Sequence, residues 1–158
     1  GRTGLDLWNE MLAVNLTGAF LTLRAGLRQL RGREWGRLLV VSSITGLQGF
    51  PYVSAYTASK HGAVGLVRAV AQEVAGTGIT ANVLCPGYLA TEMTDRTIDN
   101  IVATTGRSHE EAVQVLAGMN PQGRLIEPAE VSAAALRLCG PGSDAVNGEA
   151  IEFTGAVA

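Results

Sequence analysis

Residues 42–60, SSITGLQGFPYVSAYTASK, decide how the surrounding chain folds. They follow the apolar run 38–41, LLVV, whose short continuous pattern predicts a buried strand that ends in serines. Glycines and a proline then predict a loop over residues 44–54. Tyr56 and Lys60 lie where the next helical pattern begins. We infer that this strand, loop and helix carry the side chains that the rest of the chain supports.

Lys60 is the single lysine among the twelve lysines and arginines of the chain. Its ammonium is a compact, mobile point charge, unlike the planar fork of arginine. Tyr56 lies four residues earlier and therefore on the same predicted helical face. An adjacent cation favours phenolate, so we expect the pKa of Tyr56 to fall from about 10 towards the range of a proton donor or acceptor. The pair alone is weak evidence, because an exposed helix face often carries the same two residues.

Ser43 makes the signal more specific. It stands thirteen residues before Tyr56, at the end of the predicted strand. Ligands of parallel α/β sheets lie beyond the carboxyl ends of the strands. A hydroxyl at that place can donate a hydrogen bond to a carbonyl oxygen that is gaining charge. The three side chains together predict an acid–base site.

The serine, the Tyr-x-x-x-Lys pair and Asn15 in the segment VNLTG resemble the short-chain dehydrogenase/reductase family. The resemblance covers nearly the whole chain. It implies that Tyr56 is the proton donor or acceptor, and that Lys60 holds the nicotinamide ribose and lowers the pKa of Tyr56. It also implies that Ser43 orients the substrate carbonyl and that Asn15 anchors a proton-relay water. Taken alone, Asn15 is equally well interpreted as a helix asparagine with its amide in solvent.

The family resemblance also implies a nicotinamide cofactor, NAD or NADP. The segment 86–91, PGYLAT, is similar to the family's PGxxxT, in which the turn faces the nicotinamide and the threonine reaches the cofactor. The implied cofactor-binding residues are Tyr56, Lys60, Pro86, Gly87, Leu89 and Thr91. A Pro-Gly turn after a strand has the same letters without a cofactor, so this segment supports the hypothesis but does not establish it.

The expected reaction is the interconversion of a ketone and a secondary alcohol. Residues 120–130, NPQGRLIEPAE, resemble family members that act on 3-oxoacyl or 3-hydroxyacyl thioesters or on polyketides. The expected substrate-side residues are Ser43, Thr45, Gln48 and Met93, although for the loop residues a plain surface loop is an equal interpretation. Tyr52 is a weaker candidate than Tyr56 for the proton donor, because it lies in the loop without a lysine partner. The spacing of Met93, Ile98, Val102 and Leu116 fits either substrate contacts or a helix packed on the core.

Composition predicts one globular domain over residues 1–158, with 47% hydrophobic residues and a genuine core. A net charge of −2 gives no reason to expect nucleic acid as a partner. Cys85 and Cys139 are in no Cys-x-x-Cys spacing and are expected to be small buried hydrophobes, so neither zinc nor dithiol chemistry is expected. His61 has no ligand partner at suitable spacing, and no metal is expected. No apolar run reaches the roughly 18 to 20 residues that cross a bilayer, and we expect a cytoplasmic protein with no membrane partner.

The hydrophobic pattern predicts half of a doubly wound, Rossmann-type α/β fold, with a parallel sheet and helices on both faces. The family resemblance implies that the N-terminal strands of this fold are missing. Asp6 is expected to cap the first helix, and Ser108 and Glu111 have the spacing of a capping box. The predicted elements are helix 5–30, strand 37–43 buried on both faces, helix 54–76, strand 79–85, two short helices within 92–119, helix 128–139 and strand 149–153. The last strand runs into Phe153-Thr154-Gly155, where the family usually has Asp-Gly-Gly.

The family's TGxxxGxG turn, which cradles the cofactor pyrophosphate, is absent from these 158 residues. Residues 140–145, GPGSDA, come nearest, but they follow a helical pattern and contain a proline, so they predict a turn. We expect the chain to be the C-terminal part of a longer enzyme whose isolated first strand would expose an apolar edge. The alternative is a non-catalytic binding or oligomerisation module.

The helices at 5–31 and 54–76 are expected to form subunit contacts, because the resemblance implies a homodimer or homotetramer that pairs them. Small residues along the second helix permit close approach. Five arginines crowd the end of the first helix and the following turn: Arg24, Arg28, Arg31, Arg33 and Arg37. They are expected to be a solvated face that complements the helix C-terminus, with the binding of a phosphate-bearing substrate arm as the lesser alternative.

Overall fold

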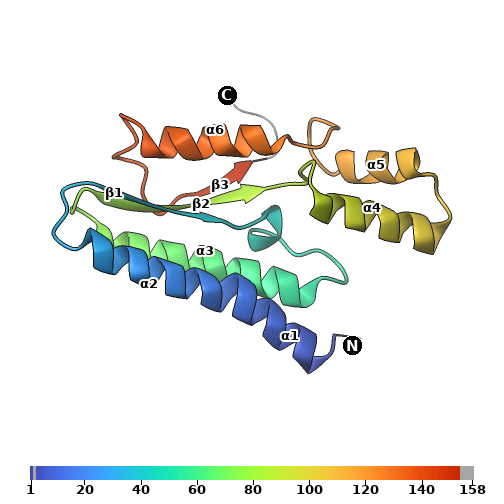
Figure 1. Cartoon of the computed structure of the whole chain (residues 1–158), viewed down its shortest axis with the longest axis horizontal. Coiled ribbons are helices and arrows are strands. Elements are labelled where there is room, and N and C mark those ends of the chain that lie inside the picture. Colours follow the sequence, from blue (N-terminus) through green and yellow to red (C-terminus); the bar gives the residue numbers. More distant parts are fainter. Residues whose placement is uncertain (2, 154–158) are drawn as a thin grey trace.

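The computed structural model describes residues 1 and 3–153, and in this part three parallel strands form one sheet. The strands are β1 (Gly36–Val41), β2 (Ile79–Pro86) and β3 (Ala150–Phe153), in the spatial order β1-β2-β3. Helices cover both faces of the sheet (Figure 1). The predicted α/β class with a parallel sheet is therefore confirmed.

The helices lie on the two faces of the sheet and beyond its carboxyl end. In Figure 1, α2 and α3 lie along one face, α6 lies along the other, and α4 and α5 lie beyond the carboxyl end of β2. The helical elements are α1 (Leu5–Leu12), η1 (Ala13–Thr17), α2 (Gly18–Leu30), η2 (Ile44–Gly46), α3 (Ser54–Val74), α4 (Glu92–Thr105), α5 (His109–Ala117) and α6 (Pro128–Cys139). Their order agrees with the predicted sequence of elements.

Strand β2 is the centre of the molecule, since all eight of its residues are buried. Its side chains alternate between two clusters. One contains Val67, Ala81 and Val83 and fills the space under α2 and α3, and the other contains Leu84 and Phe153 and fills the space under α6. Burial on both faces fixes the register of β2, and so fixes where the chain leaves the sheet after it.

Strand β1 differs from the prediction of a strand buried on both faces. It has a pairing partner on one side only within the described residues, and most of its side chains are half-buried. Val41, its last residue, is 53% exposed. The apolar sequence is the same for an edge strand as for a central one, so the pattern could not distinguish the two.

The first predicted helix is interrupted by one turn of π-helix. Residues Ala13–Thr17 form this turn between α1 and α2, and Asn15 is its middle residue. The expectation that Asp6 caps the helix is wrong, because the N-cap is Gly4 and Asp6 lies inside the first turn. Its carboxylate is still favourably placed beside the positive end of the helix dipole.

Arg37 is not part of a solvated arginine face, as the sequence suggested, because its side chain is only 2% exposed. The guanidinium donates hydrogen bonds to the carbonyl oxygens of Gly36 (2.9 Å) and Gly78 (3.1 Å) and to the hydroxyl of Ser143 (3.3 Å). It also forms an ion pair with Asp144. The other four arginines of this cluster are exposed: Arg24, Arg28, Arg31 and Arg33.

Local features of the remaining helices and of the two cysteines agree with the sequence only in part. The capping box of Ser108 and Glu111 opens α5, as predicted. Cys85 is buried, but Cys139 is only half-buried, contrary to expectation. Thr154 and Gly155 lie outside the described residues. Among the described helices, none combines the length and apolar character that a bilayer crossing needs.

Candidate active site

The structure brings Ser43, Tyr56 and Lys60 together at the carboxyl end of the sheet. Ser43 lies just past β1, and the other two lie in the first turns of α3. The Ser43 hydroxyl is near enough to the phenol of Tyr56 to lower the pKa of that phenol. The Nζ of Lys60 lies over the Tyr56 ring, 5.5 Å from the ring centroid, and donates to the carbonyl oxygen of Val41 at 3.4 Å.

The loop after β1 lies unusually close to α3. The hydroxyl of Ser42 donates to the carbonyl oxygen of Lys60 at 3.2 Å, which ties the loop to the helix. A Cβ added to Gly46 would stand 2.7 Å from that hydroxyl oxygen and 3.0 Å from the carbonyl oxygen of Lys60. Both contacts are too short for a side chain, so glycine permits the approach that places Ser43 beside Tyr56.

The Ser43 hydroxyl is oriented by its own loop. Its oxygen accepts a hydrogen bond from the backbone N–H of Thr45 at 3.2 Å. Because one lone pair is thereby occupied, the hydroxyl proton is left for another acceptor. This arrangement suits a group that donates to a substrate oxygen.

The pKa of Tyr56 is raised, which differs from the lowering expected from Lys60. Burial is the main cause, since desolvation disfavours the phenolate. The Ser43 hydroxyl opposes the rise, and the phenol of Tyr88 adds to it. Burial also lowers the pKa of Lys60. Tyr56 is therefore protonated near neutral pH and ready to act as an acid.

Asn15 is linked to α3 rather than to solvent. Its Nδ2 donates to the hydroxyl of Ser59 at 3.2 Å and lies 3.7 Å from the sulfur of Met11. Ser59 is fully buried and donates in turn to the backbone carbonyl oxygen of Tyr56 at 2.7 Å. Sequence reasoning missed Ser59, and the available signal was its place three residues after Tyr56 on the same helix.

The predicted cofactor-side residues follow β2 directly. Pro86 ends the strand, the N–H of Gly87 donates to the carbonyl oxygen of Phe153 at 2.9 Å, and Leu89 forms an isolated parallel bridge with Ile126. Thr91 precedes α4, and its hydroxyl makes no capping bond to that helix. Since β1 and β2 are parallel neighbours, this turn leaves the same end of the sheet as Ser43.

The remaining candidates fall into three groups. Thr45 is half-buried, and its hydroxyl oxygen is buried without a partner in the described part of the chain. Gln48 and Tyr52 are exposed, and Met93 is 70% exposed. The full exposure of Tyr52 separates it from the site. Ile98 and Leu116 are core residues of the α4–α5 pair, so the packing interpretation holds for these two.

Comparison with known proteins shows which family these features come from. Residues 2–123 match a family model described as short chain dehydrogenase. The chain belongs to this family. It spans only part of its relatives, however, at 59% of the length of one curated enzyme and 58% of another.

Several members of the short-chain dehydrogenase family are similar over almost the whole chain. D-beta-hydroxybutyrate dehydrogenase of Rhizobium meliloti (strain 1021) is 34% identical over 96% of the chain. The 3-oxoacyl-[acyl-carrier-protein] reductase FabG of Aquifex aeolicus (strain VF5) is 32% identical over 98% of it. A crystal structure of an actinorhodin polyketide ketoreductase variant with NADPH matches with a TM-score of 0.91, at 34% identity, over 98% of this chain and 60% of that one.

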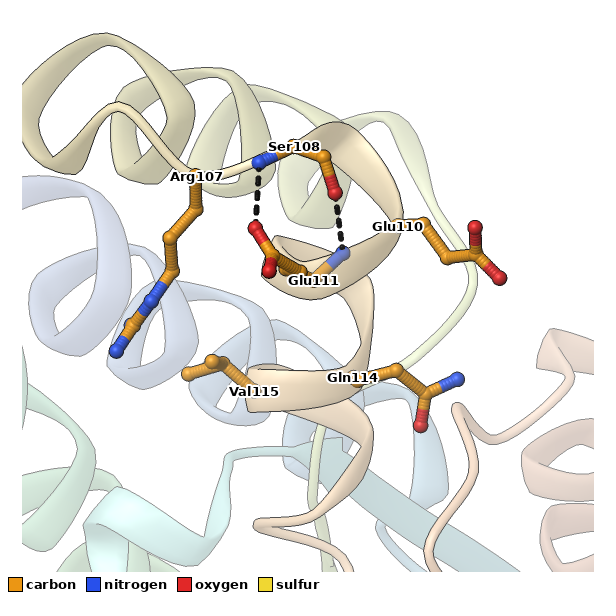
Figure 2. Close-up of a pocket in the computed structure, with 6 residues that line it drawn as sticks. All are labelled: Arg107, Ser108, Glu110, Glu111, Gln114 and Val115. Carbon is orange, nitrogen blue, oxygen red and sulfur yellow. Dashed lines mark hydrogen bonds between the residues drawn. The ribbon is translucent and has the colours of Figure 1, made fainter.

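A separate surface hollow lies beside α5, away from the residues that define the family site. Figure 2 shows the capping box at its rim, where Ser108 and Glu111 are bonded to each other's backbone. Its lining residues are Arg107, Ser108, Glu110, Glu111, Gln114 and Val115. None of them was predicted as a site residue.

Elsewhere, His61 is exposed, and residues 1 and 3–153 contain no group of three or more side chains suited to a metal ion.

Proposed function

We propose that this chain carries the catalytic residues of an NAD(P)-dependent oxidoreductase that interconverts a ketone and a secondary alcohol. The observation that supports this most directly is the convergence of Ser43, Tyr56 and Lys60 at one end of the sheet. Family membership supports the reaction class. The chain spans 59% and 58% of the length of two curated relatives, and we propose the activity for the protein that contains these 158 residues.

The residues present fit a nicotinamide dinucleotide. The ammonium of Lys60 makes one hydrogen bond within the described part of the chain, and that bond is long at 3.4 Å, so N–H groups are left for ribose hydroxyls. The phenol of Tyr56 is within reach of the same ligand. The turn after β2 would provide the remaining contacts through Pro86, Gly87, Leu89 and Thr91. Either NAD or NADP is compatible with these residues.

Each side chain has one part in the reduction. A bound nicotinamide dinucleotide supplies a hydride, which is received by the carbonyl carbon of the substrate. Tyr56 gives its proton to the carbonyl oxygen, and Ser43 donates a hydrogen bond to the same oxygen as its negative charge develops. Lys60 stabilises the resulting phenolate, and Asn15 supports the path by which Tyr56 is reprotonated.

The proposed substrates are 3-oxoacyl or 3-hydroxyacyl thioesters or polyketide-like ketones. Relatives with such names support this class, as does the segment 120–130. Thr45, Gln48 and Met93 are the proposed substrate-side residues besides Ser43. The half-buried Thr45, with its free hydroxyl oxygen, is the best placed of these to contact a polar group.

A homodimer or homotetramer through the helices at 5–31 and 54–76 is also proposed. Its support is a set of large apolar side chains left exposed on α1, η1 and α2. These are Leu5, Leu7, Val14, Phe20 and Leu21, with exposures from 43% to 71% across the set. Large apolar side chains exposed along one helical stretch are consistent with an interaction surface at residues 5–31.

Replacing the proposed acid tests the function. In the protein as expressed from its own gene, Tyr56→Phe is expected to lower turnover of a 3-oxoacyl thioester by a factor of about 10² to 10⁴ or more. The cofactor should still bind. NADPH fluorescence gives binding, and NADPH absorbance gives turnover. The matched control is Tyr52→Phe, which removes a fully exposed phenol and should leave both values unchanged. Retained turnover in Tyr56→Phe would rule out the assigned acid.

The alternative function is a non-catalytic binding or oligomerisation module. It is motivated by the lack of a dinucleotide turn within these 158 residues and by the partial coverage of relatives. The DNA sequence upstream of Gly1 separates the two. An in-frame strand followed by TGxxxGxG supports the enzyme, and a stop codon with a ribosome site directly before Gly1 supports the module.

A further inference from the structure

Asn120 is a buried amide that holds the turn after β2. Its side chain belongs to a residue only 1% exposed. The Oδ1 accepts a hydrogen bond from the N–H of Tyr88 at 3.0 Å, while the Nδ2 donates to the carbonyl oxygens of Tyr88 at 2.9 Å and Arg124 at 2.7 Å. The amide therefore binds both backbone groups of one residue. Such a pairing fixes the orientation of that peptide segment.

Gly87 is fitted to the same amide. A Cβ added at this position would lie 2.2 Å from the Oδ1 of Asn120. Any side chain at residue 87 would therefore displace the amide or the turn. The glycine and the asparagine together fix the backbone where the chain leaves β2, beside the proposed cofactor contacts Pro86 and Leu89.

Asn120 also connects this turn to the α4–α5 helix pair. Its N–H donates to the carbonyl oxygen of Ala117, the last residue of α5, at 3.0 Å. The side chain of Tyr88 packs on the cluster formed by Ile98, Ala112 and Leu116 of that pair. The phenol of Tyr88 also contributes to the raised pKa of Tyr56.

We propose that Asn120 is a positioning residue that holds the Gly87–Tyr88 backbone in the orientation needed by the nicotinamide cofactor. This inference rests on the proposed function. In this proposal Asn120 does not contact the substrate and acts only through the turn at Gly87 and Tyr88. The α4–α5 pair is thereby coupled to the cofactor side of the site.

The test compares two buried asparagines in the protein as expressed from its own gene. Asn82, also 1% exposed, donates to the carbonyl oxygen of Val146 at 2.7 Å and accepts from the N–H of Glu149 at 3.0 Å, so it holds the segment that enters β3. Asn120→Ala should speed hydrogen exchange at the Tyr88 amide at least tenfold and weaken NADPH binding about tenfold, as expected for one lost buried hydrogen bond. Asn82→Ala should lower stability while leaving both values within twofold of wild type.

The Asn120→Asp variant adds a pH signature. It keeps an acceptor for the N–H of Tyr88 but places a carboxylate against two carbonyl oxygens. A protonated carboxyl can donate to the carbonyl oxygen of Tyr88 again. NADPH affinity of N120D is therefore expected to recover as the pH falls from 8 to 6, whereas wild type should change by less than twofold.

If the Asn120 variants fold poorly, the single variant Gly87→Ala still tests the proposal, because its methyl group would displace the amide and should speed hydrogen exchange at the Tyr88 amide in a chain that keeps Asn120. Where Asn120→Ala does fold, the double variant adds a second comparison. In the wild-type background the added methyl group should weaken NADPH binding at least tenfold, and in an Asn120→Ala background, where the amide is gone, the extra loss should be under threefold. Additive losses would overturn the proposal, as would unchanged Tyr88 exchange in Asn120→Ala. Hydrogen exchange at Tyr88 is measured without cofactor, so it tests the positioning role independently of catalysis. A parent protein with no NADPH turnover would count against the proposed function and not against the role of Asn120.

Discussion

At the scale of single residues, burial and the nearby Ser43 hydroxyl act in opposite directions on the pKa of Tyr56. The sequence predicts that the ammonium of Lys60 lowers its pKa, but the ammonium lies over the ring face, 5.5 Å from the centroid. Burial of the phenol raises the pKa and is the larger effect. The net direction favours a protonated tyrosine, as proton donation to a carbonyl oxygen requires.

The direction of this shift predicts different pH profiles for the two directions of the reaction. Reduction needs the phenol, so kcat/KM for a ketone should stay flat from pH 6 to 9. Oxidation needs the phenolate, so kcat/KM for the alcohol should rise roughly tenfold per pH unit below the pKa. Initial rates in both directions across this range provide the check. An oxidation rate that is flat between pH 7 and 9 would mean that the phenol ionises below neutrality, contrary to the effect of burial.

Most of the candidate site could be predicted because its chemistry is carried by residues close in sequence. Ser43, Tyr56 and Lys60 lie within one strand–loop–helix unit, whose spacing can be recognised from the sequence. Ser59 and Asn120 could not be found in this way. Ser59 receives the amide of Asn15, 44 residues away, and Asn120 binds the backbone of Tyr88, 32 residues away. A single sequence does not show which distant segments meet.

At the scale of elements, the loop that enters β3 is held to the amino end of the sheet by Arg37. Its guanidinium reaches two carbonyl oxygens, a serine hydroxyl and the carboxylate of Asp144. The group is buried although its ionic partner is 73% exposed. If the side chain were removed, the carbonyl oxygens of Gly36 and Gly78, the hydroxyl of Ser143 and the carboxylate of Asp144 would each lose the guanidinium as a partner.

Arg37→Ala is therefore expected to lower the free energy of unfolding by about 1–3 kcal/mol, because it removes the hydrogen bonds that the buried guanidinium makes to Gly36, Gly78 and Ser143. Arg33→Ala is the matched control, since Arg33 is exposed, and it should change stability by less than about 0.5 kcal/mol. Urea unfolding followed by circular dichroism measures both. Equal losses in the two variants would contradict the role assigned to the buried guanidinium.

The elements themselves were predictable where their signals are local. The Ser108 capping box and the start of α6 at Pro128 both appear as expected. The failures have non-local causes. The exposure of β1 depends on what pairs with its other edge, and the half-burial of Cys139 depends on what packs beside α6.

At the scale of the whole molecule, the open edge of β1 is the main liability. It presents unpaired backbone groups within the described part of the chain and ends in the exposed Val41. Such an edge is a template for pairing with another strand. The 158-residue polypeptide is therefore expected to associate when it is produced by itself.

A charge on this edge should reduce that association. Val41→Lys is expected to shift the polypeptide towards the monomer in size-exclusion chromatography with light scattering, because a charged side chain opposes edge-to-edge pairing. Leu136→Lys introduces the same charge on α6, where Leu136 is 72% exposed, and should have a smaller effect. If both variants reduce association equally, general solubility rather than the strand edge is the cause.

The π-helical turn at Ala13–Thr17 sets the phase between the two halves of the first long helix. A π turn takes one residue more than an α turn, so α1 is rotated by about 100° relative to a continuous α-helix. Deleting one residue from this turn would restore regular winding and swing the outer half of the helix to another side. The five-residue turn therefore acts as an angular spacer, and insertions or deletions within it should be tolerated far less well than substitutions at its exposed positions.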